Sequence, residues 1–219
     1  FNIYELPYWS SISLSFLFFL GIINSFNFLD GINGLSSMLT ILVSSVYALL
    51  FSALDKPLFI TLALCIIGAQ LAFLPYNLLR AKIFMGDTGS MIMGFFAALL
   101  SIYFLQSNAL SQDQILEHID AMLFAFAILI LPILDSTREI FIRVFIKKVS
   151  PFKADRNHLH HVLLDIGLNH FQATLWLVGI NASFIAFTWL LNPYIRASLL
   201  FSILFFLALG LSQVPFLVR

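Results

Sequence analysis

Long apolar stretches separated by short polar segments make up most of this sequence of 219 residues. A helix needs about 20 predominantly apolar residues to cross the hydrocarbon core of a bilayer. Seven stretches approach this length with at most one charged residue each: residues 9–26, 34–54, 57–76, 89–106, 119–134, 171–191 and 197–218. We therefore predict an all-α polytopic membrane protein with about seven transmembrane helices, forming one domain over residues 1–219.

The fifth stretch and the polar segment after it differ from the rest of the chain. The stretch is the shortest and carries Pro132 near its end, so we expect a kink or a tilt there. Residues 135–170 follow as the longest polar segment. Within it, residues 136–149 place apolar and basic side chains at helical spacing, which predicts a basic amphipathic helix in the lipid headgroup layer. A second, short helix is predicted over residues 157–166, ending at Gly167.

Composition and charge support a membrane protein and orient it. Hydrophobic residues make up 61% of the chain, charged residues make up 10%, and the mean hydropathy is +0.99, which excludes a soluble domain. The formal net charge is zero, but every basic residue except Lys56 and Arg196 falls on one face of the predicted topology. Because cytoplasmic loops retain Lys and Arg, we predict that this face is cytoplasmic.

Three polar clusters lie on that same face, because an even number of predicted spans separates each cluster from the next. The first cluster contains Asn24, Asn27 and Asp30, and their spacing places them within roughly a 120° arc of one helix. The Asp-Gly and Asn-Gly pairs that follow are typical of a simple turn. A turn does not account for Asn24 and Asn27, which lie closer to the bilayer, where polar groups are costly. We therefore favour a binding role for this cluster.

The second cluster is the sequence Met-Gly-Asp-Thr-Gly-Ser, residues 85–90, directly before a predicted span. The carboxylate of Asp87 is suited to Mg²⁺, which prefers one or two carboxylates together with phosphate oxygens and water. Backbone N–H groups at the start of the helix are suited to an anion. Considered alone, Asp87 is explained equally well as a helix N-cap.

The third cluster contains His158, His160 and His161. A structural zinc site would normally add cysteine or further spaced ligands, which the neighbouring sequence does not provide. The adjacent Arg156 favours an anionic ligand, so phosphate recognition is the better interpretation. Arg138 and Asp135, at the end of the fifth stretch, either join this site or anchor their helix in the interface.

Together the clusters resemble the motifs of the polyprenyl-phosphate N-acetylhexosamine-1-phosphate transferases, a family of integral membrane enzymes. The motifs are Asn-x-x-Asn-x-x-Asp-Gly-x-x-Gly, Met-Gly-Asp-x-Gly-Ser and Asp-Arg-x-His-Leu-His-His, in the order and with the intervening spans typical of the family. Residues 132–138 and 150–156 are similar to the GlcNAc-type branch rather than to the muramoyl-pentapeptide branch.

The resemblance implies transfer of a sugar 1-phosphate, by preference GlcNAc 1-phosphate, from a UDP-N-acetylhexosamine to undecaprenyl phosphate. The reaction would take place at the bacterial inner membrane and release UMP. Its lipid-linked sugar product would start a cell-envelope polysaccharide. The resemblance also implies Mg²⁺, or Mn²⁺ in its place, bound by Asp87. We expect membrane lipids as further partners and no nucleic acid, and we leave a homodimer open. The roles implied are catalytic for Asp30, Asp87 and His158, and substrate-binding for Asn24, Asn27, Asn33, Arg138, Arg156, His160 and His161.

Two departures from the family pattern affect this interpretation. Asn33 stands where the family generally has a second aspartate, so a negative charge is replaced by an amide that still forms hydrogen bonds. The family's paired aspartates belong to earlier spans, and no two acidic residues are adjacent in this chain. We therefore expect a C-terminal portion of a transferase that is inactive alone. The alternative is a non-catalytic paralogue, a scaffold or a transporter of the same fold.

Overall fold

The computed structural model describes residues 7–79, 81–110, 120–150 and 158–218, and every regular element within these residues is a helix. Six helices are long and apolar enough to cross a membrane, which makes the chain a multi-pass membrane protein and confirms the predicted fold class. These six are α1 (Tyr8–Leu29), α2 (Leu35–Ala53), α3 (Pro57–Asn77), α4 (Gly86–Leu110), α8 (His170–Leu191) and α9 (Ala197–Val218).

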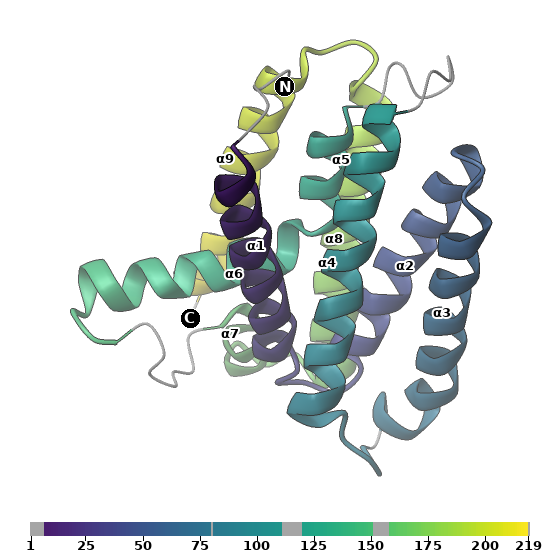
Figure 1. The fold of residues 1–219 in the computed structure, drawn as a ribbon. Helices are drawn as coiled ribbons and strands as arrows, with labels where there is room; N and C mark the ends of the chain where they lie inside the picture. Colours follow the sequence, from purple (N-terminus) through teal and green to yellow (C-terminus); the bar gives the residue numbers. More distant parts are fainter. Residues whose placement is uncertain (1–6, 80, 111–119, 151–157, 219) are drawn as a thin grey trace.

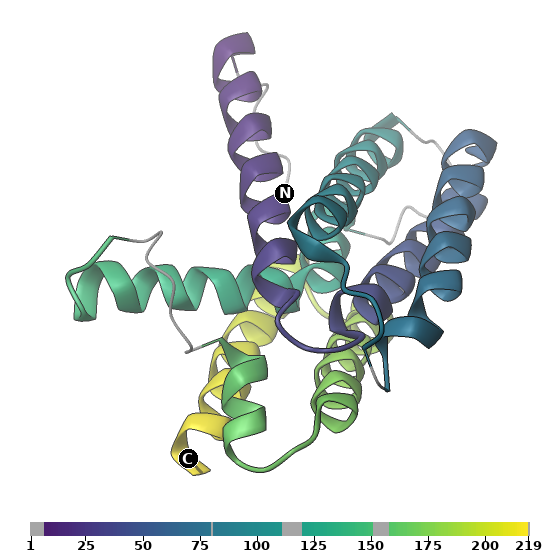
Figure 2. The same ribbon diagram turned by 90° about the horizontal axis from the view of Figure 1, so that it is seen from below.

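The long helices form a bundle whose connections alternate between its two ends (Figure 1). α2 packs mainly against α3, α1 packs against α4, and the short helix α5 (Ala121–Ile128) packs against α8. The connections after α1 and α3 and the short helix α7 (Leu159–Asp165) lie at the same end, as Figure 2 shows from below. This end therefore brings together segments that are more than 100 residues apart in the sequence.

An apolar core fixes the relative positions of α1, α2 and α4. Phe26, Tyr47, Phe51 and Phe104 are fully buried in it. The Tyr47 hydroxyl donates to Ser101 Oγ at 2.6 Å, which satisfies a polar group that would otherwise be costly in this interior. Large apolar side chains cover the outer faces of the helices, as expected for surfaces that contact lipid.

The fifth predicted span is a broken helix rather than a straight crossing. α5 ends after eight residues, and α6 (Ile130–Phe141), continued by the π-helical turn η1 (Ile142–Ile146), departs at 71°. A helix of eight residues covers only about 12 Å, which is too short to cross a bilayer. The predicted kink is confirmed, but it falls at Leu129 rather than at Pro132.

The predicted start of the amphipathic helix is wrong, because of the same break. The helix begins at Ile130, six positions before the predicted start, because the chain turns out of the bundle at Leu129. In Figure 1, α6 lies roughly across the long helices. The second predicted helix is confirmed as α7, and Gly167 ends this segment with a φ of +101°.

Candidate active site

Two carboxylates on different helices meet at the shared end of the bundle. Asp30 directly follows α1, and Asp87 lies in the first turn of α4. The Asn27 side-chain amide donates to Asp87 Oδ1 at 3.2 Å and to Ser90 Oγ at 3.1 Å. The Gly86 backbone N–H donates to the Asp30 carboxylate. We call Asn27, Asp30, Asp87 and Ser90 the acid site.

Two glycines explain why α1 and α4 approach closely enough to form the acid site. A Cβ at Gly94 would lie only 2.8 Å from the Ile23 Cα and 3.0 Å from the Phe26 Cβ, so the helices can pack here only without a side chain. Gly86 begins α4 with a φ of +66°, a conformation that glycine adopts without strain. α4 therefore begins at Gly86, and Asp87 lies inside the helix rather than at its N-cap.

The acid site concentrates negative charge. Partial burial and, to a smaller extent, the nearby Asp87 carboxylate raise the pKa of Asp30, the hydrogen bond from Gly86 opposes them, and the net pKa is about 6. A divalent cation would relieve this repulsion. Within the described part of the chain, no three His, Cys, Asp or Glu residues are grouped to hold a metal. Two carboxylates beside an amide and a hydroxyl fit a hard cation that completes its shell with water and phosphate oxygens.

The raised pKa of Asp30 predicts a pH dependence of cation binding. Below about pH 6 Asp30 is protonated and must lose its proton before it can act as a ligand, so the affinity for Mg²⁺ should fall by up to about tenfold per pH unit. Calorimetric titration of the full-length protein between pH 5 and 7.5 would measure this. Asp30→Asn should flatten the profile, and a steep profile that persists in this variant would contradict the assignment.

A second group of polar side chains is centred on Asp135 of α6. This carboxylate is fully buried, and its Oδ2 accepts a hydrogen bond from His158 Nδ1 at 2.8 Å. Its Oδ1 accepts the Leu159 backbone N–H at 2.8 Å, which also holds the start of α7. A proton on Nδ1 leaves His158 Nε2 as an acceptor, 3.3 Å from an Arg143 guanidinium nitrogen. We call Asp135, Arg143, His158 and His160 the histidine site.

Arg138 lies beside this site but contacts other groups. Its guanidinium bonds to Glu139 at 2.9 Å and lies 3.7 Å over the Phe216 ring of α9. The contact with Phe216 favours the anchoring alternative for Arg138, since it connects α6 to α9. Arg143 instead provides the basic group next to His158. The predicted binding residue Arg156 lies outside the described residues.

The acid site and the histidine site are neighbours, separated by the connection between α1 and α2. The Phe28 ring lies 5.4 Å from the His158 ring, and the His160 ring packs directly against Gly31. His160 is only 1% exposed, and neither of its ring nitrogens has a hydrogen-bond partner among the described residues. Burial lowers the pKa of His160 to about 3, so this side chain is neutral at physiological pH. His161 lies against it, with the ring centroids 4.2 Å apart.

Gly31→Ala is expected to disturb the histidine site. The new Cβ would overlap the His160 ring, which is buried and must therefore shift. We expect kcat/KM in the full-length protein to fall about tenfold, with a loss of at most about 1–3 kcal/mol in the free energy of unfolding. Gly68→Ala is a matched control, because a Cβ there meets nothing within 4 Å. Wild-type activity in Gly31→Ala would show that the position of His160 is unimportant.

Asn24 and Asn33 both lie apart from the acid site, and for Asn24 this differs from the predicted arc shared with Asn27 and Asp30. The Asn24 amide donates to the Leu20 carbonyl of its own helix and borders a groove of about 590 Å³ between α1 and α6. The Asn33 backbone is held by α8: its N–H lies 3.3 Å from His170 Nδ1, and its carbonyl accepts from the Thr174 hydroxyl at 2.9 Å.

Several polar contacts at this end were not identified from the sequence. Asn77 accepts the Gly34 backbone N–H at 2.6 Å and donates to the Ile83 carbonyl at 2.9 Å, which ties the first two clusters together. Asp135 was a candidate from its place at the end of the fifth stretch, but its pairing with His158, 23 residues away, was not predicted. His170 is exposed but contacts the Asn33 backbone.

Comparison with known proteins agrees with this arrangement. The model of glycosyl transferase family 4 matches residues 1–105. A probable undecaprenyl-phosphate N-acetylglucosaminyl 1-phosphate transferase of Bacillus subtilis is 34% identical over 78% of this chain and 46% of its own length. A decaprenyl-phosphate N-acetylglucosaminephosphotransferase of Mycolicibacterium smegmatis is 33% identical over 96% of this chain and 55% of its own length.

A phospho-N-acetylmuramoyl-pentapeptide-transferase of Staphylococcus haemolyticus is 40% identical, but over only 46% of this chain and 33% of its own length. The match to glycosyl transferase family 4 and the similarity to these relatives confirm the predicted resemblance. The chain spans about half the length of the two N-acetylglucosamine-phosphate transferases that it matches.

Proposed function

We propose that the protein containing this chain transfers GlcNAc 1-phosphate from UDP-GlcNAc to undecaprenyl phosphate. The observation that carries the proposal is the convergence of the acid site and the histidine site at one end of a membrane bundle. The relatives are named as polyprenyl-phosphate N-acetylglucosamine-phosphate transferases, which supports the same chemistry. The activity belongs to the full-length protein, and this segment contributes the part of the site described above.

The acid site is suited to a Mg²⁺ ion, or Mn²⁺ in its place. Asp87 and Asp30 would hold the ion together, while Asn27 fixes the Asp87 carboxylate through its 3.2 Å hydrogen bond. A bound divalent ion supplies charge neutralisation for two approaching phosphate groups. The residues of the chain supply the fixed positions that bring the two substrates together.

The proposed reaction is a single phosphoryl transfer. An oxygen of the acceptor phosphate forms a bond to the β-phosphorus of the UDP-sugar, and the bond from that phosphorus to the bridging oxygen breaks. UMP leaves with the electron pair of that bond. In this arrangement the donor phosphates would lie beside the histidine site and His161. Asp135 holds the His158 ring in one tautomer and one orientation.

The groove between α1 and α6 is suited to the prenyl chain of the acceptor. It is lined mainly by apolar side chains, and polar groups at Asn24, Ser25, Ser136 and Thr137 interrupt this lining. Asn24 and Asn27 are neighbours on the last turns of α1, so the groove passes close to the acid site. A lipid in the groove would present its phosphate at the membrane surface, and the basic residues on this side support a cytoplasmic orientation.

Stoichiometric formation of both products would test the proposed function. The full-length protein, incubated with UDP-GlcNAc, undecaprenyl phosphate and Mg²⁺, should release one UMP for each lipid-linked GlcNAc formed. Competing UDP-N-acetylhexosamines would define the donor, since pocket contacts discriminate similar sugars by only about 1–3 kcal/mol. Absence of UMP release with every donor would support the non-catalytic alternative.

A further inference from the structure

The break between α5 and α6 leaves two backbone groups that a continuous helix would have paired. Pro132 has no N–H, so the Ile128 carbonyl four residues earlier lacks its helical donor. On the other side of the break, the Leu131 N–H points away from α5. Both groups are buried, and a buried backbone group without a partner costs about 1–3 kcal/mol.

One side chain of α8 satisfies both groups. Asn181 donates from Nδ2 to the Ile128 carbonyl at 3.1 Å, and its Oδ1 accepts the Leu131 N–H at 3.1 Å. Asn181 is fully buried, in a span where polar side chains are costly. An amide provides one donor and one acceptor on adjacent atoms, which matches the two groups that the break leaves.

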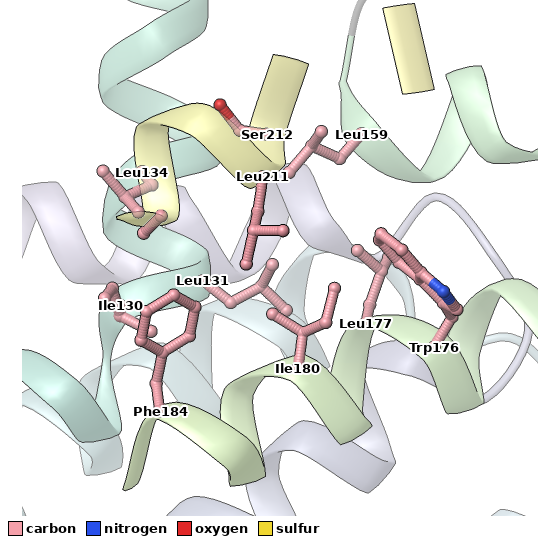
Figure 3. Close-up of a pocket in the computed structure, with 11 residues that line it drawn as sticks. Ile130, Leu131, Leu134, Leu159, Trp176, Leu177, Ile180, Phe184, Leu211 and Ser212 are labelled. Carbon is pink, nitrogen blue, oxygen red and sulfur yellow. The ribbon is translucent and has the colours of Figure 1, made fainter. Parts of the chain in front are cut away.

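Packing around the break is incomplete. A small apolar cavity of about 30 Å³ lies beside it, lined by Ile130 and Leu131 of α6, Ile180 and Phe184 of α8, and Leu211 of α9, as well as other apolar side chains (Figure 3). Close packing alone therefore does not fix the angle of the break. The two hydrogen bonds of Asn181 are directional and hold both sides of the break at once.

We infer that Asn181 is a positioning residue for the histidine site, acting through the direction of α6. α6 carries Asp135, six residues after Leu129, and Asp135 in turn holds His158 and the start of α7. A change in the direction of α6 displaces Asp135 from His158. The effect on catalysis rests on the proposed function, whereas the effect on the helix angle does not.

The helix angle can be measured directly in the full-length protein by electron paramagnetic resonance. Spin labels would be placed at Cys65, which is exposed on α3, and at Phe145→Cys, whose native residue is 67% exposed in η1 beyond the end of α6, with any cysteine outside this segment replaced. α6 and η1 together form a lever of about 25 Å, so a rotation of only about 12° moves its end by about 5 Å. Asn181→Leu should broaden the distance distribution and shift it by at least this amount.

Thr188→Val is the matched control for this substitution. Thr188 is also fully buried on α8, but its hydroxyl donates only to the Phe184 carbonyl of the same helix at 2.8 Å. Removing that hydroxyl should leave both the distance distribution and the UMP release unchanged.

Pro132→Ala separates positioning from simple stabilisation. Combined with Asn181→Leu, it returns an N–H to the Ile128 carbonyl and lets the helix continue straight, so the double variant should fold even if Asn181→Leu alone does not. We expect thermal stability to recover in the double variant while kcat/KM stays about 10–100-fold below wild type. A purely structural role predicts that activity recovers together with stability.

The double variant Asp135→Asn with Asn181→Leu tests the route through Asp135. If Asn181 acts through that carboxylate, the double variant should lose no more than about twofold in kcat/KM beyond Asp135→Asn alone. An unchanged distance distribution in Asn181→Leu and in its Pro132→Ala combination would overturn the inference, whether or not the protein is a transferase. A shifted distribution without UMP release in the wild type would refute the proposed function alone.

Discussion

Asp87→Asn is expected to abolish UMP release by the full-length protein, with a loss of about 10³-fold or more in kcat/KM. The substitution keeps the shape of the side chain and its ability to accept the hydrogen bond from Asn27. It removes the negative charge that the proposed cation requires. Because the ion offsets the charge of two phosphates at the reacting centre, weaker cation binding should lower the rate of transfer itself.

Asp55→Asn is the matched control. Asp55 is exposed in the connection between α2 and α3, at the opposite end of the bundle, and its φ of +51° is tolerated by Asn as well as by Asp. This variant should retain wild-type activity. Retention of more than a tenth of the activity in Asp87→Asn would refute a role of this carboxylate in holding the ion.

Asp135→Asn is expected to lower kcat/KM about 100-fold, because the amide no longer fixes the protonated Nδ1 of His158. One oxygen of Asp135 also accepts the Leu159 N–H, so the amide cannot reproduce both bonds. His158→Gln should cause a loss of similar size. If the two residues act as one unit, the double variant should lose little more than either single variant.

Measurements of thermal stability distinguish a joint catalytic role of Asp135 and His158 from a purely structural contact between them. Each variant should be compared with wild type for melting temperature in the same detergent and at the same pH. Multiplicative losses of activity that parallel the losses of stability would contradict a joint role and indicate that Asp135 only supports the fold. Non-additive losses of activity with folded variants would support it.

Much of the fold follows from the sequence because the bilayer imposes a simple length rule on apolar stretches. Residues 34–54 and 171–191, for example, correspond to α2 and α8 within one residue at each end. The rule failed at residues 119–134, where apolar composition cannot distinguish a crossing from a helix that bends out of the bundle. Pro132 signalled the break, but the groups that hold it are on α8, in Asn181, about 50 residues later.

The candidate site was predictable as a set of motifs but not as a geometry. Helical spacing correctly placed Asn27 and Asp30 together, since both lie at the acid site. The same spacing placed Asn24 with them, whereas this residue borders the groove, because an arc of about 120° is wide enough to face two different helices. The pairing of Asp135 with His158 depends on the direction of α6, which no local pattern specifies.

In the proposed function, Asp30 and Asp87 form one divalent-cation site beside the histidine site. Titration of the full-length protein with Mn²⁺, followed by electron paramagnetic resonance, measures this most directly. We predict one bound Mn²⁺ that Mg²⁺ displaces, with an affinity at least about tenfold weaker in Asp30→Asn and in Asp87→Asn and unchanged in Asp55→Asn. Wild-type Mn²⁺ affinity in both of the first two variants would contradict the account.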